Sequence, residues 1–190
     1  MKTEVQSSKF KVQRRNVRIG AFWLVCAFAA GSFSTFGSGG PITPVEDLAR
    51  RADAIVHGKV ASLECTKDSH GQMFTRVELD VAEVWKGSPT NHFSLVHAGG
   101  VLGGRWVRVS GGPEFRLGEE VVVFTVRNPQ GDAVTMDLAQ GKFAVTGKGG
   151  DQLVSNGPIG GSNARARYRL PTQLPLPLTE LKRRVEGSLR

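Results

Sequence analysis

The chain contains little cysteine and few aromatic residues, and these shortages limit what it can be. Only Cys26 and Cys65 are cysteines among its 190 residues. Phe, Trp and Tyr make up 7% of the chain, with a single tyrosine. Two cysteines exclude the multiple disulfides that staple small exported domains. One tyrosine leaves few stacking platforms for bases, which argues against single-strand nucleic-acid binding.

Recognisable catalytic and metal-binding motifs are also missing. The four histidines show neither the HExxH pattern nor the spacing of a zinc site; they are His57, His70, His92 and His97. No serine lies in a GxSxG elbow. The glycine-rich stretch 99–104 is not followed by the Lys-Ser/Thr of a phosphate-binding loop. We therefore predict no catalytic residue, no metal site and no cofactor.

Long apolar runs are absent, and the most apolar stretch of the first forty residues is short. Residues 1–18 hold six basic residues and one acidic residue, and the apolar run Ile19–Ala30 follows. Small residues dominate positions 31–40. This order is typical of a secretory signal. We predict a signal segment over residues 1–38, with cleavage between 29 and 40.

Three other interpretations of this segment stay open. A membrane anchor needs about 20 apolar residues, and the run Ile19–Ala30 has 12. A lipoprotein signal needs a small residue before its cysteine, whereas Val25 precedes Cys26. The pair Arg14-Arg15 resembles a twin-arginine signal, although the residues after it fit that pattern poorly. Ordinary secretion is favoured, so membrane contact is expected only in transit unless the segment stays uncleaved.

The net charge of +8 is unevenly distributed. From residue 41 onward, 19 basic and 16 acidic residues give +3, and residues 165–190 alone contribute seven basic and two acidic residues. Residues 41–164 therefore carry a net charge of −2. A basic protein usually suggests a nucleic-acid partner. Here the positive charge belongs to the signal and the tail, so nucleic acid is not favoured.

The rest of the chain has the pattern of a mainly β domain. Residues 45–51 suit a short helix, and residues 179–189 suit a helix with Leu181, Val185 and Leu189 on one face. Strands are expected at 54–63, 74–85, 92–97, 121–126, 133–138 and 142–146, with one more inside the loop 99–112. The run 121–126 is apolar throughout, as in strands covered on both faces. No βαβ rhythm is present, which favours an antiparallel barrel or sandwich.

These elements divide the chain into four segments. After the signal segment 1–38, residues 41–146 form the predicted β domain. Residues 147–177 are rich in Gly and Pro and are predicted to form a linker or loop. Residues 178–190 form the predicted C-terminal helix, expected to dock on its own domain.

Four phrases carry a resemblance to known proteins. They are 52–60 (ADAIVHGKV), 81–87 (VAEVWKG), 115–124 (FRLGEEVVVF) and 140–143 (QGKF). Their order and spacing resemble a group of exported bacterial proteins of unknown function. More distantly, they are similar to the OB-barrel of netrin-like domains and tissue inhibitors of metalloproteinases. The resemblance implies an OB-like antiparallel barrel of five to six strands, and a periplasmic or extracellular bacterial location.

One departure from that family limits what the resemblance implies. The metalloproteinase inhibitors place a disulfide-locked N-terminal cysteine on the catalytic zinc. In this chain Cys65 is the one cysteine beyond the signal segment, and no cysteine lies near a plausible mature N-terminus. Inhibition by that mechanism is not implied. Cys65 is expected to pack in the core, because free cysteines commonly behave as small buried hydrophobes.

The stretch Arg105–Arg108 is the candidate binding surface. Strand alternation places Trp106 and Arg108 on one side, and Trp and Arg are enriched at interaction hot spots. We predict Arg105, Trp106 and Arg108 as binding residues, although Trp106 could instead plug the barrel end. Trp85 is expected in the core.

The predicted function is an exported, non-catalytic interaction module whose partner is an envelope protein or glycan. The alternatives are an enzyme or accessory subunit with a site in the Gly-rich loops, or single-strand nucleic-acid binding.

Overall fold

The structure is a computed structural model that describes residues 43–156 and 175–190. The predicted signal segment 1–38, its cleavage region 29–40 and residues 157–174 of the predicted linker lie outside the described residues. Within the described ranges, no helix has both the length and the apolar character needed to cross a membrane.

Strands dominate the described residues, with one α-helix near each end. The helices are α1 (Val45–Arg51) and α2 (Leu178–Ser188), with 3-10 turns η1 (Leu138–Gly141) and η2 (Gly149–Asp151). The strands are β1 (Ala54–Lys67), β2 (Met73–Lys86), β3 (His92–Ala98), β4 (Gly100–Leu102), β5 (Arg105–Val107), β6 (Glu120–Arg127), β7 (Ala133–Thr135), β8 (Lys142–Thr146), β9 (Leu153–Asn156) and β10 (Leu176–Pro177). The prediction of a mainly β, antiparallel structure is therefore confirmed.

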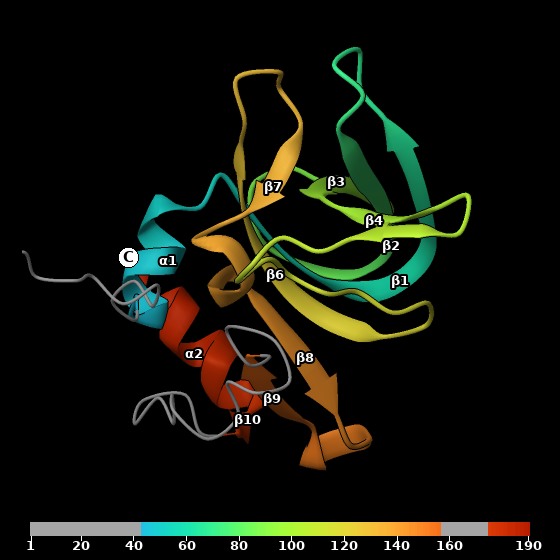
Figure 1. Cartoon of the computed structure of the whole chain (residues 1–190). Coiled ribbons are helices and arrows are strands. Elements are labelled where there is room, and N and C mark those ends of the chain that lie inside the picture. The colour runs from blue at the N-terminus through green and yellow to red at the C-terminus, as the bar shows by residue number, and fades with distance from the viewer. Residues whose placement is uncertain (1–42, 157–174) are drawn as a thin grey trace, which may run out of the picture. The chain divides into compact units, whose positions relative to one another are not determined.

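One antiparallel sheet forms the body of the domain (Figure 1). Its strand order is β10-β9-β8-β6-β1-β2-β3. The short strand β7 pairs with β6 at residues 125–127, after the residues 121–123 that pair with β8. Strands β1 and β2 are long and strongly bent because the register between them shifts three times, at Ile55/Val56, His57/Gly58 and Val60/Ser62. Such irregularities bend a strand and increase its twist. The bend lets β1 pair with β6 through residues 54–59 and continue beside β2 to Lys67.

The hydrogen-bonded ladder does not close into a barrel. Within the described residues, β3 and β10 are the two ends of the path. β7 lies against β3, but no ladder joins them. The main sheet also has eight strands rather than the expected five or six. The expected closed barrel is therefore corrected to an open, curved sheet.

Strand β6 separates two apolar cores, as its continuous apolar sequence predicts. Val122 and Phe124 face a cluster that includes the helices, where Phe124 packs on Phe143 with ring centroids 5.5 Å apart. Val121 and Val123 face the inside of the curved sheet. All four β6 residues are fully buried. Coverage on both faces is thus confirmed.

Helix α2 packs against α1 and the sheet. Leu181 and Val185 are fully buried in the cluster of α1 and β6, whereas Leu189 lies beyond the helix end and is exposed. Arg184 donates two hydrogen bonds to Glu46 of α1, at 2.7 and 2.9 Å. These hydrogen bonds from Arg184 lower the pKa of Glu46 below its ordinary value.

The Gly-rich stretches contain more structure than their composition predicted. Residues 99–112 hold a complete hairpin, β4–β5, instead of one short strand. Residues 147–156, predicted as loop, hold η2 and β9, and β9 joins the main sheet beside β8. The expected strand 133–138 ends at Thr135, and η1 carries the chain on to β8.

Candidate functional site

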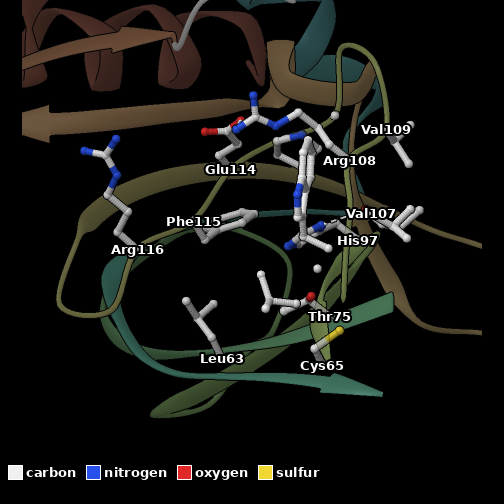
Figure 2. Close-up of a pocket in the computed structure, with 16 residues that line it drawn as sticks. Leu63, Cys65, Thr75, His97, Val107, Arg108, Val109, Glu114, Phe115 and Arg116 are labelled. Atoms are coloured by element: carbon white, nitrogen blue, oxygen red, sulfur yellow. Dashed lines mark hydrogen bonds and ion pairs between the residues drawn. The ribbon is translucent and has the colours of Figure 1, made fainter. Parts of the chain in front are cut away.

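A pocket of about 430 Å³ lies between the β4–β5 hairpin and the curved sheet. We call it the hairpin pocket. Its lining residues come from β1, β2, β3, the hairpin and the segment before β6; they are Leu63, Cys65, Thr75, His97, Ala98, Gly100, Val101, Trp106, Val107, Arg108, Val109, Gly112, Pro113, Glu114, Phe115 and Arg116. Figure 2 shows Leu63, Cys65 and Thr75 opposite Arg108 and Glu114. Volumes of 300–1,000 Å³ are typical of ligand sites.

The floor of the pocket is one row across three neighbouring strands. Cys65 of β1 lies opposite Thr75 of β2, and Thr75 lies opposite His97 of β3. Residues directly opposite one another share a sheet face. Thr75 is buried, and its hydroxyl donates to the carbonyl of Gly99 at 2.7 Å. The sheet thus presents a thiol, a hydroxyl and an imidazole to one cavity.

No hydrogen bond joins the side chains of Cys65, Thr75 and His97, three described residues of this row. The Thr75 hydroxyl donates to the Gly99 carbonyl, and His97 Nδ1 lies 3.0 Å from the Ala98 carbonyl oxygen. Covalent catalysis needs the nucleophile within hydrogen-bond reach of its base, about 3 Å. Among the described residues, no group of three or more His, Cys, Asp or Glu side chains is arranged to hold a metal ion.

The outer wall is formed by the hairpin and its continuation. The Arg108 guanidinium lies 5.8 Å from the centroid of the Trp106 ring. The same guanidinium pairs with Glu114 at 2.7 Å, across the pocket rim. The Trp106 side chain is 69% exposed. Stacking holds a large aromatic face at the pocket mouth, where it is accessible to solvent.

A buried lysine holds the third wall in place. Lys142 of β8 donates to both carboxylate oxygens of Glu119, at 2.7 and 2.8 Å, and also to the carbonyl of Glu114. Its ammonium lies 4.9 Å from the centroid of the Phe115 ring. Burial lowers the pKa of Lys142, against the opposing effect of the Glu119 carboxylate. One side chain therefore ties residues 114–119 to the sheet.

His97 packs on the same aromatic ring. Its imidazole stacks on Phe115 at 5.7 Å, and Nδ1 lies 3.0 Å from the carbonyl oxygen of Ala98. Because a carbonyl only accepts, Nδ1 carries the proton and Nε2 is the acceptor of the neutral ring. Burial lowers the pKa of His97 below 6.5, and the Lys142 charge adds to this effect.

We expect the protein to lose stability as the pH falls below about 6.5, in part through His97. In the unfolded chain His97 has its ordinary pKa, so the unfolded state binds more protons in this window and acidification favours it. His97→Gln should flatten the slope of unfolding free energy against pH, measured by urea titration at each pH. The matched control is His70→Gln at an exposed turn position. An unchanged slope in His97→Gln would contradict this assignment.

The predicted binding residues separate into two groups. Trp106 and Arg108 line the hairpin pocket together, and Trp106 does not plug the interior of the sheet. Arg105 lies on the exposed hairpin but is not part of the lining. Trp85 is half-buried and packs against the helix-side core, and its indole N–H donates to Glu83 at 2.9 Å.

The core placement expected for Cys65 is wrong. Cys65 is a half-buried free thiol that lines the pocket, and Leu63 beside it is 38% exposed. The register places Leu63 opposite Val77 and Cys65 opposite Thr75, so both lie on the inner face of the sheet, but at the end of β1, where the hairpin pocket rather than packed side chains covers them. Val60 is buried, whereas residues 61–67 are exposed or half-buried, because the packed core ends before this part of β1. Strand alternation gives the face of Cys65 but not where the core ends along the strand.

Exposed apolar side chains gather around this pocket. Six of the eleven large exposed hydrophobic residues among the described positions lie on the hairpin or the pocket lining; they are Leu63, Val101, Leu102, Trp106, Val107 and Val109. Scattered single exposures need no explanation, but a contiguous apolar patch marks an interaction site. The pocket and its surroundings are therefore the strongest candidate for a functional surface.

The phrases that carried the resemblance have structural roles in this chain. Asp53 accepts from the backbone N–H of Arg127 at 2.8 Å. Lys86 donates to the carbonyls of Ala49 and Arg50 at the end of α1, both at 2.9 Å. A cation there satisfies helix-terminal carbonyls and complements the helix dipole. These residues explain the fold rather than a reaction.

A second polar cluster lies on the helix side of the sheet. Buried His57 lies 2.8 Å from Glu120, which also accepts from the Gln152 amide at 2.9 Å. The His57 ring lies 6.1 Å from Trp85. These contacts link β1, β2, β6 and the β8–β9 connection, so the cluster supports the fold.

Comparison with known proteins finds no match, either to a protein-family model or to a curated protein sequence.

Proposed function

We propose that the chain is an exported, non-catalytic interaction module of the bacterial cell envelope or extracellular space, which binds a partner protein or glycan through the hairpin pocket. The observation that carries the proposal is the exposed Trp106–Arg108 stack at the mouth of a preformed pocket. Trp and Arg are the residue types most enriched at binding hot spots. Export is part of the proposal and rests on the signal-like pattern of residues 1–38.

The OB-like assignment also belongs to this proposal. An antiparallel curved sheet with irregular long strands and an apolar inner core supports it. So does the order of the four phrases shared with the netrin-like domains. In this proposal the sheet is an opened variant of that architecture, and the hairpin after β3 supplies the binding surface.

A non-catalytic role is favoured by the chemistry of the pocket. His97 is oriented by a backbone carbonyl and an aromatic ring, and the Thr75 hydroxyl donates to the Gly99 carbonyl rather than to His97. Arg108 is neutralised by Glu114. Apolar side chains outnumber the groups that could transfer protons in the lining. Such a lining suits binding in which an apolar group of the partner is buried, rather than proton transfer to a substrate.

The test is a binding titration of candidate envelope proteins and glycans against the purified chain. Trp106→Ala should weaken binding at least tenfold, because truncating a central aromatic hot spot costs about 2 kcal/mol or more. Leu153→Ala is the matched control, since Leu153 is 41% exposed on β9, outside the pocket lining. Equal affinities of Trp106→Ala and the parent chain, or turnover of any candidate substrate, would overturn the proposal.

A further inference from the structure

We propose that the hairpin pocket binds a peptide segment of a partner protein in which an apolar side chain lies next to acidic residues. This inference rests on the proposed function and narrows it to the chemistry of the ligand. Four features of the described residues support it: the cavity, the apolar surface around it, the local charge and an unpaired strand edge.

The cavity fits an apolar side chain. Leu63, Val107, Val109 and Phe115 contribute to its lining. Phe115 is nearly buried and belongs to the inner core, so it forms a fixed base for a guest side chain. Burying an apolar side chain of ordinary size stabilises a complex by about 1.5–3 kcal/mol. The pocket thus supplies an anchor point.

The apolar surface extends beyond what a small molecule in the cavity would cover. Val101 and Trp106 are each 69% exposed, and Val107 is 47% exposed. These side chains lie on the protruding hairpin as well as at the pocket mouth. A polypeptide that places one side chain in the cavity and continues across the mouth covers them, and this favours a protein partner.

The local charge selects an acidic partner. Arg108 and Arg116 in the lining outweigh Glu114 by one positive charge, and Arg105 on the hairpin adds another. Residues 41–164 as a whole carry −2, so the positive charge is a local feature. Opposite charges at the rim of an interface speed encounter and suppress wrong partners.

The hairpin also offers a free strand edge. Among the described strands, β5 pairs with β4 alone, so one edge of Arg105–Val107 has no strand partner. An extended peptide adds to such an edge through main-chain hydrogen bonds, while alternate side chains enter pockets. Trp106 of this strand and Arg108 directly after it both line the pocket. The geometry therefore suits a peptide bound in extended form.

The experiment selects peptides from a random phage-displayed library on the purified full-length chain. Phage that also bind the Trp106→Ala chain are removed first, so that the peptides kept depend on Trp106. Enriched peptides should combine an apolar residue with neighbouring Asp or Glu. Bound peptide should also protect Cys65 from alkylation by N-ethylmaleimide, as followed by mass spectrometry of the fragment that contains Cys65. Protection would locate the peptide in the pocket, because Cys65 is part of the lining.

Charge variants give two changes of opposite sign in the affinity of a selected peptide, measured by fluorescence anisotropy. Arg116→Gln should weaken binding about two- to fivefold, and Glu114→Gln should strengthen it by a similar factor, as expected for exposed charge pairs. Lys148→Gln removes one exposed positive charge outside the pocket lining and should have no effect. A folding defect could not produce the gain in Glu114→Gln.

Failure of this inference differs from failure of the proposed function. Enriched peptides that protect Cys65 but carry no acidic residue would overturn the acidic-peptide proposal and leave the interaction module intact. A small apolar molecule found by native mass spectrometry, or a dimer dissolved by Trp106→Ala in sedimentation, would also overturn it. If no peptide protects Cys65 and no binding depends on Trp106, both proposals are wrong.

Discussion

Replacing Lys142 with methionine is expected to lower the free energy of unfolding by about 3 kcal/mol, the lower end of the range for breaking a buried ion pair. The Lys142 side chain is 9% exposed and Glu119 is 20% exposed. Without the ammonium, the Glu119 carboxylate stays in a poorly solvated place with one hydrogen bond from the Arg116 backbone N–H, at 3.0 Å. The Glu114 carbonyl also loses its donor. Urea unfolding would measure the loss.

Two further variants separate the causes. Lys142→Met combined with Glu119→Gln should recover part of the loss, because the uncompensated charge is gone while the amide oxygen still accepts from Arg116. Lys182→Met is the matched control, since Lys182 and Glu83 form an ion pair with side chains 37% and 43% exposed. Exposed pairs contribute about 0–1 kcal/mol. Equal losses in Lys142→Met and Lys182→Met would contradict the burial argument.

Replacing Gly100 with alanine is expected to cost roughly 2–4 kcal/mol, from backbone strain and from overpacking together. Gly100 has φ +141°, a conformation that residues with a Cβ rarely adopt. A Cβ there would lie 2.6 Å from the Cys65 sulfur and would also clash with the Thr75 hydroxyl. Thr75 cannot move away cheaply, because it is buried and hydrogen-bonded to Gly99.

The same substitution should separate the hairpin from the sheet and abolish binding at the pocket. Unfolding free energy and amide exchange of residues 100–107 would measure the two effects. Gly103→Ala is the matched control: Gly103 has φ +57°, but its Cβ would meet nothing within 4 Å. It should cost only the strain of one left-handed residue, about 1–2 kcal/mol. Normal hairpin exchange in Gly100→Ala would contradict the close contact.

The parts of the fold that the sequence predicts are those with strong local patterns. In β2, Val77 and Leu79 alternate with Arg76, Glu78 and Asp80, and the buried and less buried positions follow that alternation. The apolar β6 is buried on both faces. Period and composition determine burial directly in such strands, so no tertiary information is needed.

The parts that the sequence does not predict depend on contacts between distant segments. The β4–β5 hairpin does have a local signal, Gly103-Gly104, because two-residue hairpin turns favour positive φ and both glycines have it. The burial of Lys142 has no such local signal. A lysine in a strand is expected to be exposed, and only the folded structure brings Glu119 next to Lys142. The pocket itself needs the bend of β1, the hairpin and the segment 112–116 together.

The site was therefore only half predictable. Trp106 and Arg108 could be singled out because their residue types and their alternation mark a recognition surface. The sequence does not single out His97, Thr75 or Phe115, because each looks like an ordinary strand or loop residue. Only the pairing of the strands and the path of residues 112–116 bring them to the pocket. The predicted core position of Cys65 was wrong because alternation gives only the face of the sheet, whereas the hairpin that covers this end of β1 with a pocket comes from a distant segment.

The position of α2 in the core bears on when the chain can fold during its synthesis. Leu181 and Val185 complete a cluster whose other members begin at Val45 of α1. A ribosome that has made the chain only to residue 175 has supplied the main strands but not the helix that covers Val122 and Phe124 on that face. This layer can therefore pack fully only after residues 178–188 have been made, and until then Val122 and Phe124 lack part of their cover on that face.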